Sequence, residues 1–113
     1  MATYTREPLS GSTSGTPIAV TSTDSAGAQT AHTCDTNKHE IYLFAHNIST
    51  AAVDLYTEMG STIGPVIQSI SPRAGMVPVL PGSFLTGSKV VKCYCSTVST
   101  AALFVEGWVN KIS

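Results

Sequence analysis

Apolar and polar residues alternate along short segments of this chain, and this period of two is the feature that most constrains its fold. In the segment AVDLYTEMG (residues 52–60), Val, Leu, Thr and Met share one face while Asp, Tyr and Glu share the other. No window combines helical periodicity with helix-forming residues. The other segments expected to be strands are residues 40–46, 65–71, 76–82, 89–96 and 102–112. The sequence therefore predicts an all-β fold, an antiparallel β-sandwich or jelly-roll-like barrel.

Two prolines distinguish one of these segments from the others. Pro78 and Pro81 lie within residues 76–82, and because proline donates no backbone hydrogen bond we expect an edge strand or a bulged strand there. The next segment, GSFLTGSK (residues 82–89), resembles a phosphate-binding loop. Its order is Gly-Ser-Lys rather than Gly-Lys-Ser, however, and it leads into a predicted strand instead of a helix. We therefore expect a hairpin-type loop.

The composition is poor in charge and rich in hydroxyl groups. Of the 113 residues, which suffice for one domain, only 12% are charged, and the formal net charge is −1. Without a basic patch that could release counterions from a phosphate backbone, nucleic-acid binding is not expected. Low charge with a positive mean hydropathy of +0.18 indicates instead that another chain covers part of the surface. The 14 Ser, 15 Thr, 9 Gly and 6 Pro favour short strands and turns.

The N-terminal third differs from the rest. It contains few large apolar residues, and SGSTSGT (residues 10–16) has the composition of a flexible spacer. PIAVTS (residues 17–22) could form one short edge strand, since proline can begin a strand. We expect residues 1–37 to be an extended Ser/Thr/Gly-rich arm and residues 38–113 to be the β-sandwich domain. Such an arm cannot bury a core of its own, so it is either a disordered tail or ordered by lying on another surface.

Targeting signals and disulfide bonds are not expected. The N-terminus lacks an apolar signal core, and no run approaches the ~18 apolar residues of a membrane span. The chain has three cysteines, Cys34, Cys93 and Cys95. Because this number is odd and nothing marks the chain as secreted, we expect three reduced thiols.

All three histidines lie in one stretch, HTCDTNKHEIYLFAHN (residues 32–47). His32, Cys34 and His39 have the spacing H-x-C-x4-H, which matches no common zinc motif. The Cys-x-Cys pair at residues 93–95 is more typical of small core side chains on a strand than of a metal knuckle. The intervening DTNK has the composition of a turn. We therefore expect a polar turn that leads into a core strand, with no metal and no cofactor.

Motifs for catalysis are also missing. The thiol of Cys34 has His32 and Asp35 as neighbours in the sequence, but neighbours in a turn seldom converge as a nucleophile and its base must. No Gly-x-Ser-x-Gly motif is present, and no two carboxylates are singled out as a glycosidase pair. The sequence does not predict an enzyme.

Four strings carry a likeness to known proteins: HT at residues 32–33, EIYLFAHNIS at 40–49, SPRAGMVPVLPG at 71–82 and GWVNKI at 107–112. Through these strings, which are spread over most of residues 32–112, the chain resembles small virion structural proteins of tailed bacteriophages. The three cysteines and a single Gly60 depart from the pattern of that family. The strings are ordinary β-sheet sequence rather than catalytic signatures.

The resemblance implies a capsid decoration (cement) protein, made in the host cytoplasm and located in the virion. It would bind the outer surface of the head and stabilise the expanded shell by bridging subunits of the major capsid protein. Proteins of this type are often homotrimers, so further copies of the chain are expected partners, whereas nucleic acid and membrane are not. The alternative is a low-copy neck, tail or fibre component, which as a fibre tip could bind carbohydrate.

Two sets of residues are candidates for these contacts. An arm strand that adds to an exposed sheet edge would contact the capsid, through Arg6, Pro8, Leu9, Pro17, Ile18 and Val20. Aromatic residues, which are enriched at protein interfaces, would mediate self-association, and the candidates are Tyr42, Tyr56 and Trp108. For Trp108, filling the core is the competing interpretation.

Overall fold

Nine β-strands make up the regular structure of the chain. The computed structural model describes residues 3–96 and 103–112. Its strands are β1 (Tyr4–Pro8), β2 (Ile18–Ala19), β3 (Gln29–Thr33), β4 (Lys38–Asn47), β5 (Val53–Met59), β6 (Val66–Ile70), β7 (Val77–Leu85), β8 (Val90–Cys95) and β9 (Leu103–Ile112). All of their pairings are antiparallel. The described residues contain no helix, and so none long and apolar enough to cross a membrane.

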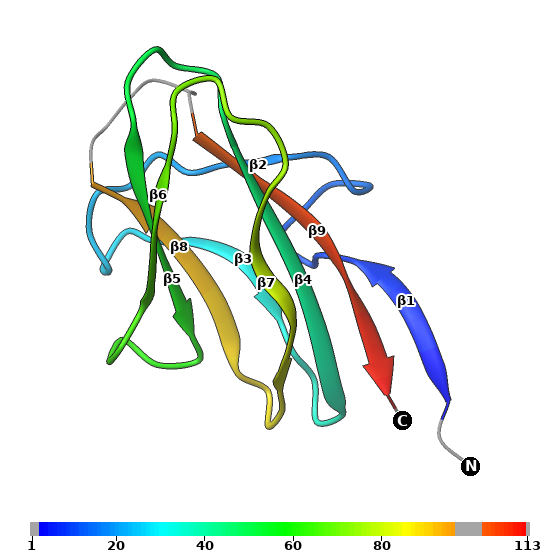
Figure 1. Ribbon diagram of the computed structural model, residues 1–113. Helices are drawn as coiled ribbons and strands as arrows, with labels where there is room; N and C mark the ends of the chain where they lie inside the picture. Colours follow the sequence, from blue (N-terminus) through cyan, green and yellow to red (C-terminus); the bar gives the residue numbers. More distant parts are fainter. Residues whose placement is uncertain (1–2, 97–102, 113) are drawn as a thin grey trace.

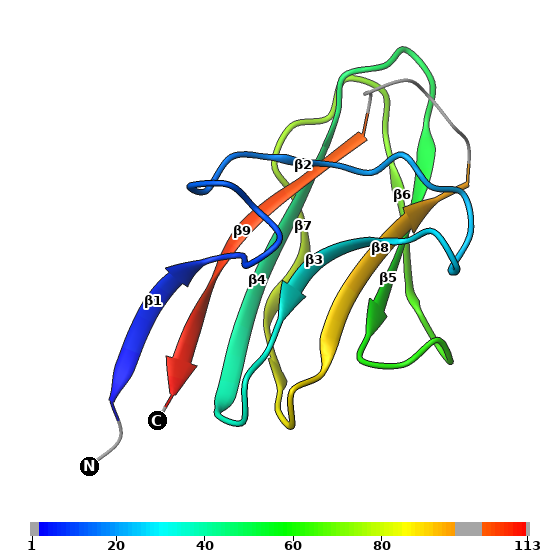
Figure 2. The same ribbon diagram turned by 180° about the vertical axis from the view of Figure 1, so that it is seen from behind.

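The strands form two sheets that pack face to face (Figures 1 and 2). The first sheet has the order β1-β9-β4-β7, and β2 also pairs with β9. The second sheet has the order β3-β8-β5-β6. The predicted all-β antiparallel sandwich is therefore confirmed.

Strand β7 has the irregularity that its prolines predict. It is an edge strand, and its register against β4 shifts at two places, next to Pro78 and next to Pro81. The predicted hairpin-type loop after β7 is wrong, because residues 82–85 still belong to β7 and because β7 and β8 lie in different sheets. The connection at residues 86–89 therefore crosses from one sheet to the other.

Alternate side chains of the central strands fill the space between the sheets. Burial alternates along β4 and the start of β5, as the period of two requires. Burying one large aliphatic side chain is worth about 1.5–3 kcal/mol. The three cysteines are buried. Fully buried apolar side chains of the central strands are Ile41, Leu43, Ala45, Leu55, Val91, Cys93, Val105 and Val109.

The N-terminal third is part of the sandwich. Strands β1 and β2 pair one after the other with β9, on the side opposite to β4, and β3 is an edge strand of the second sheet. The side chains of Leu9 and Val20 are each 1% exposed, and Ala31 is fully buried. The structure therefore does not show an extended arm over residues 1–37. A segment with few large apolar residues cannot form its own core, but those residues can contribute to a core built by other strands.

Gly107 allows β9 to lie close against β4. A Cβ atom at this position would be 1.9 Å from the backbone oxygen of Tyr42, far inside any van der Waals contact. Its φ of 155° is also a conformation that residues with side chains rarely adopt. Glycine is therefore required near the middle of the β4–β9 pair.

The burial of Leu9 predicts that the N-terminal third contributes to stability. Leu9→Ala should lower the free energy of unfolding by about 2–5 kcal/mol, the usual cost of truncating a buried leucine. Urea denaturation measures the change, and Ile63→Ala is the matched control because Ile63 is 87% exposed. The control should change stability by no more than about 0.5 kcal/mol. If Leu9→Ala changed the free energy of unfolding as little as the control does, residues 1–20 would be a dispensable arm.

Candidate functional sites

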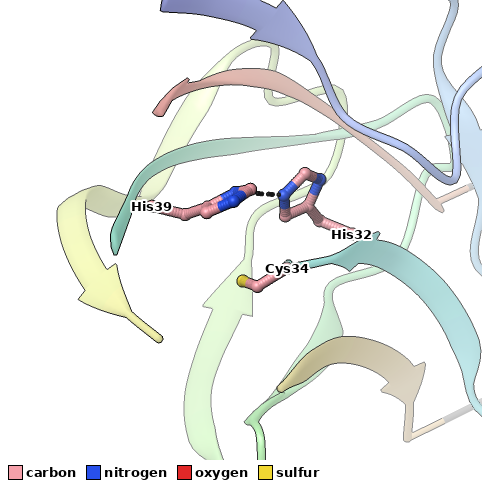
Figure 3. A group of neighbouring side chains, drawn as sticks. All are labelled: His32, Cys34 and His39. Carbon is pink, nitrogen blue, oxygen red and sulfur yellow. Dashed lines mark hydrogen bonds between the residues drawn. The ribbon is translucent and has the colours of Figure 1, made fainter. Parts of the chain in front are cut away.

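Three potential metal ligands meet where β3 turns into β4 (Figure 3). His32 belongs to β3, Cys34 follows β3 directly, and His39 belongs to β4. One ring nitrogen of each histidine and the Cys34 Sγ all lie within 4.8 Å of one another, and all three side chains are buried. Strand β3 lies in the second sheet and β4 in the first. The cluster therefore depends on how the two sheets face each other, which the spacing of its residues in the sequence does not reveal.

A continuous chain of hydrogen bonds fixes the protons of the two histidines. The backbone N–H of Ser10 donates to His32 Nδ1 at 3.0 Å. A backbone amide can only donate, so Nδ1 carries no proton and Nε2 must carry one. His32 Nε2–H then donates to His39 Nδ1 at 2.9 Å. Asp35 Oδ1 lies 2.9 Å from His39 Nε2 and can only accept, so His39 carries its proton on Nε2. The contact of the Asp35 backbone N–H with the same nitrogen is longer, at 3.4 Å.

Asp35 connects this chain of hydrogen bonds to the first sheet. Its Oδ2 pairs with Lys111 Nζ of β9 at 2.7 Å, and its Oδ1 accepts the backbone N–H of Asn37 at 2.8 Å. The latter bond is the Asp-turn geometry that DTNK predicts. The bond to Lys111, followed by those to His39 and Asn37, holds the pKa of Asp35 below its usual value. The polar network thus connects the N-terminal segment, the β3–β4 turn and the last strand.

Burial keeps the interior of this cluster uncharged. Desolvation, and next the neighbouring His39, lower the pKa of His32 from 6.5 to about 4, against a smaller opposing effect of Asp35. Desolvation, together with Asp35, raises the pKa of the Cys34 thiol above its usual 9.0. At neutral pH the cluster therefore holds a neutral imidazole and a protonated thiol. A protonated thiol is a poor nucleophile, so the arrangement favours a structural or ligand-binding role over thiol catalysis.

Tyr42 and Trp108 belong to a stack of rings on the outer face of the first sheet. Trp108 stacks on Tyr42 and on Phe44, with ring centroids 5.2 and 5.5 Å apart, and the Arg6 guanidinium carbon lies 5.6 Å from its ring centroid. Trp108 is half-buried there and does not fill the core. Its Nε1 is buried, and no hydrogen-bond partner for it occurs among residues 3–96 and 103–112. Rings that cover one another do not form the open platform on which a sugar stacks.

Tyr56 lies on the second sheet, beside a strand with unusual exposure. It stacks on Tyr94 with centroids 4.8 Å apart, and its register partner on β6 is Ile67. Ile63, Val66 and Ile67 are 87%, 38% and 58% exposed. Val66 and Ile67 belong to β6, and Ile63 lies in the connection that precedes it. We call these three residues the apolar edge, because β6 is an edge strand of its sheet.

The apolar edge was not among the residues singled out from the sequence. A signal was present, since no charged residue lies between Glu58 and Arg73. However, apolar residues without charge are equally typical of a buried strand. Ile70 at the end of the same strand is in fact fully buried.

The residues predicted to contact the capsid divide into two groups. Arg6, Pro8 and Pro17 are exposed, and Ile18 is half-buried against the core. Leu9 and Val20 lie inside the sandwich. Those two side chains cannot contact another protein while the fold is intact.

Comparison with known proteins found no match. Neither a family model, nor a curated protein, nor a solved structure matches this chain.

The neutral His32 predicts a dependence of stability on pH in metal-free buffer. Between pH values of about 6.5 and 4 the unfolded chain binds a proton at His32 and the folded chain does not. The free energy of unfolding should therefore fall as the pH is lowered through this window, by at most about 3 kcal/mol. Urea denaturation at several pH values measures it. His32→Gln should flatten the dependence, and an unchanged slope in this variant would show that His32 is not held neutral.

Proposed function

We propose that this chain is a structural protein of a tailed-phage virion, of the capsid decoration type, that binds the major capsid protein on the outer surface of the head. The resemblance of residues 32–112 to such proteins suggests the class. The observation that carries the proposal is the apolar edge on β6, a surface suited to pairing with another protein chain.

An unprotected edge strand exposes a row of unpaired backbone groups that other strands can bind. Soluble proteins usually protect such edges with charged residues, prolines, bulges or a covering segment. Strand β6, with the sequence VIQSI, has no charge, no proline and no register shift against β5. The apolar edge therefore has the properties of a binding surface.

The other sheet edges are protected. Strand β1 carries Arg6, Glu7 and Pro8, and β2 has only two residues. Strand β7 carries two prolines and two register shifts. The N-terminal segment covers the outer side of β3, because the Gly11 N–H donates to Ala31 O and Ser10 Oγ accepts from the Thr33 N–H. Within the described residues, β6 is thus the edge that lacks such protection.

The contact surface in this proposal differs from the one that the sequence predicted. An arm that adds a strand to the capsid would have to release Leu9 and Val20 from the core, which is costly. Pairing of a capsid segment with β6 requires no such release and forms main-chain hydrogen bonds. A protein that binds only the expanded lattice stabilises it by mass action, and many copies on a symmetric shell add their effects.

Homotrimer formation is part of the same proposal. Tyr56 adjoins the apolar edge through Ile67, so it lies beside the surface assigned to the capsid, and its nearness to Ile67 is no separate argument for contacts between copies. Tyr42 and Trp108 are already stacked within one chain, which makes them weaker candidates.

The copy number in purified virions tests the proposed function. Quantitative mass spectrometry of particles of the encoding phage should find about one copy or a simple fraction of a copy per major capsid subunit. A handful of copies per particle would move the protein to the neck or tail. Absence from the particle would contradict a virion role.

The apolar edge predicts a defect in binding for one surface variant. Ile67→Lys should weaken binding to expanded capsids at least tenfold, because losing one buried isoleucine contact costs about 1.5–3 kcal/mol and 1.4 kcal/mol is tenfold. Co-sedimentation with capsids measures it. Ile48→Lys is the matched control, since Ile48 is 53% exposed in the β4–β5 connection, at the other end of β5. Equal binding by both variants would show that β6 is not the surface that binds the capsid.

A further inference from the structure

We propose that His32 Nε2, His39 Nδ1 and Cys34 Sγ bind one zinc ion. This inference is independent of the proposed virion role. It also goes against the expectation from the sequence, where the spacing H-x-C-x4-H matches no common zinc motif.

The distances are close to those of a zinc site. Tetrahedral Zn²⁺ with Zn–N of about 2.0–2.1 Å and Zn–S of about 2.3 Å places neighbouring ligand atoms about 3.3–3.6 Å apart. The two histidine nitrogens are 2.9 Å apart, and one ring nitrogen of each histidine lies within 4.8 Å of the Cys34 Sγ. The two imidazole nitrogens must therefore move apart by a few tenths of an ångström, and the Cys34 Sγ must move about 1 Å closer to them. Cys34 lies just beyond the end of β3, where its backbone N–H donates to Lys89 O at 2.9 Å, so the approach must come from its side chain.

The surroundings of His39 suit a metal ligand. His39 donates its Nε2 proton to Asp35 Oδ1 at 2.9 Å, and this bond directs the Nδ1 lone pair into the cluster. Lys111 holds the same carboxylate from the other side at 2.7 Å. Metal-binding histidines almost always have such a carboxylate or carbonyl on the second nitrogen. The hydrogen bond to Asp35 therefore orients the His39 ring as a metal ligand even in the absence of metal.

The surroundings of His32 give the proposal its most specific consequence. The proton on His32 Nε2 now lies between the two histidines, in the place that a metal would take. When zinc binds Nε2, this proton must move to Nδ1, where the Ser10 N–H now donates. Two N–H groups would then face each other, so the bond from Ser10 must break. Zinc binding is therefore expected to release the backbone amide of Ser10.

The balance of charge also defines the expected pH dependence. Zinc replaces the thiol proton of Cys34, so one proton is released for each ion bound, while the His32 proton stays on the ring. A fourth position, not supplied by these three residues, is left for a water molecule. Binding should weaken as the pH falls, because protons compete for the thiolate and the imidazoles.

Titration of the reduced, full-length protein with Co²⁺, followed by displacement with Zn²⁺, tests the site. One equivalent should produce the visible bands of tetrahedral cobalt and a thiolate-to-cobalt charge-transfer band in the near ultraviolet. Cys34→Ser should abolish the charge-transfer band. Asp35→Asn, a change at a partly exposed residue, should weaken binding about 10–100-fold without removing a ligand.

Matched controls come from residues outside the cluster. Cys95→Ser and His46→Gln should bind cobalt like the natural chain, and circular dichroism should show that every variant is folded. Amide hydrogen exchange should show faster exchange at Ser10 when Zn²⁺ is bound. A charge-transfer band that persists in Cys34→Ser, binding that His46→Gln removes, or no binding by the natural chain would each overturn the proposal.

Discussion

The pairing of β4 with β9 is the constraint on which the rest of the structure depends. It runs over ten residue pairs, from Lys38 opposite Ile112 to Asn47 opposite Leu103. Its inner side supplies central core residues, and its outer side carries the aromatic stack around Trp108. The free side of β9 then receives β1 and β2. Gly107 makes this close approach possible, because any side chain there would collide with the backbone of β4.

The candidate functional features follow from how segments attach to this pair. Because the N-terminal segment returns along β3, Ser10 reaches His32 and completes the buried chain of hydrogen bonds. That chain ends at Lys111 of β9, so the cluster connects both sheets. Strand β6 lies farthest from β3 in the order of the second sheet and remains open at its outer side. Its apolar edge is therefore a feature of the surface, whereas the histidine cluster is a feature of the interior.

The sequence predicted local structure better than the contacts between distant segments. The alternation in residues 52–60 indicated β5, and the prolines of β7 indicated an edge with bulges. Burial of Leu9 could not be predicted, because one apolar residue among serines and glycines resembles a linker until a partner strand is known. The histidine cluster forms because strands of two different sheets face each other, and the spacing of the three residues in the sequence does not reveal this arrangement. Ile67 and Ile70 are the same residue type, yet pairing exposes one and buries the other.

Amide hydrogen exchange of the full-length protein in metal-free buffer would test most directly whether the N-terminal third is part of the fold. The Val20 N–H donates to Leu103 O at 2.9 Å, and the Gly11 N–H donates to Ala31 O at 3.0 Å. Both amides should be protected nearly as strongly as those in the centre of β4, because opening them requires separation from the core. Exchange of Gly11 and Val20 at the rate of an unstructured peptide, beside a protected β4, would contradict this account and restore a free N-terminal arm.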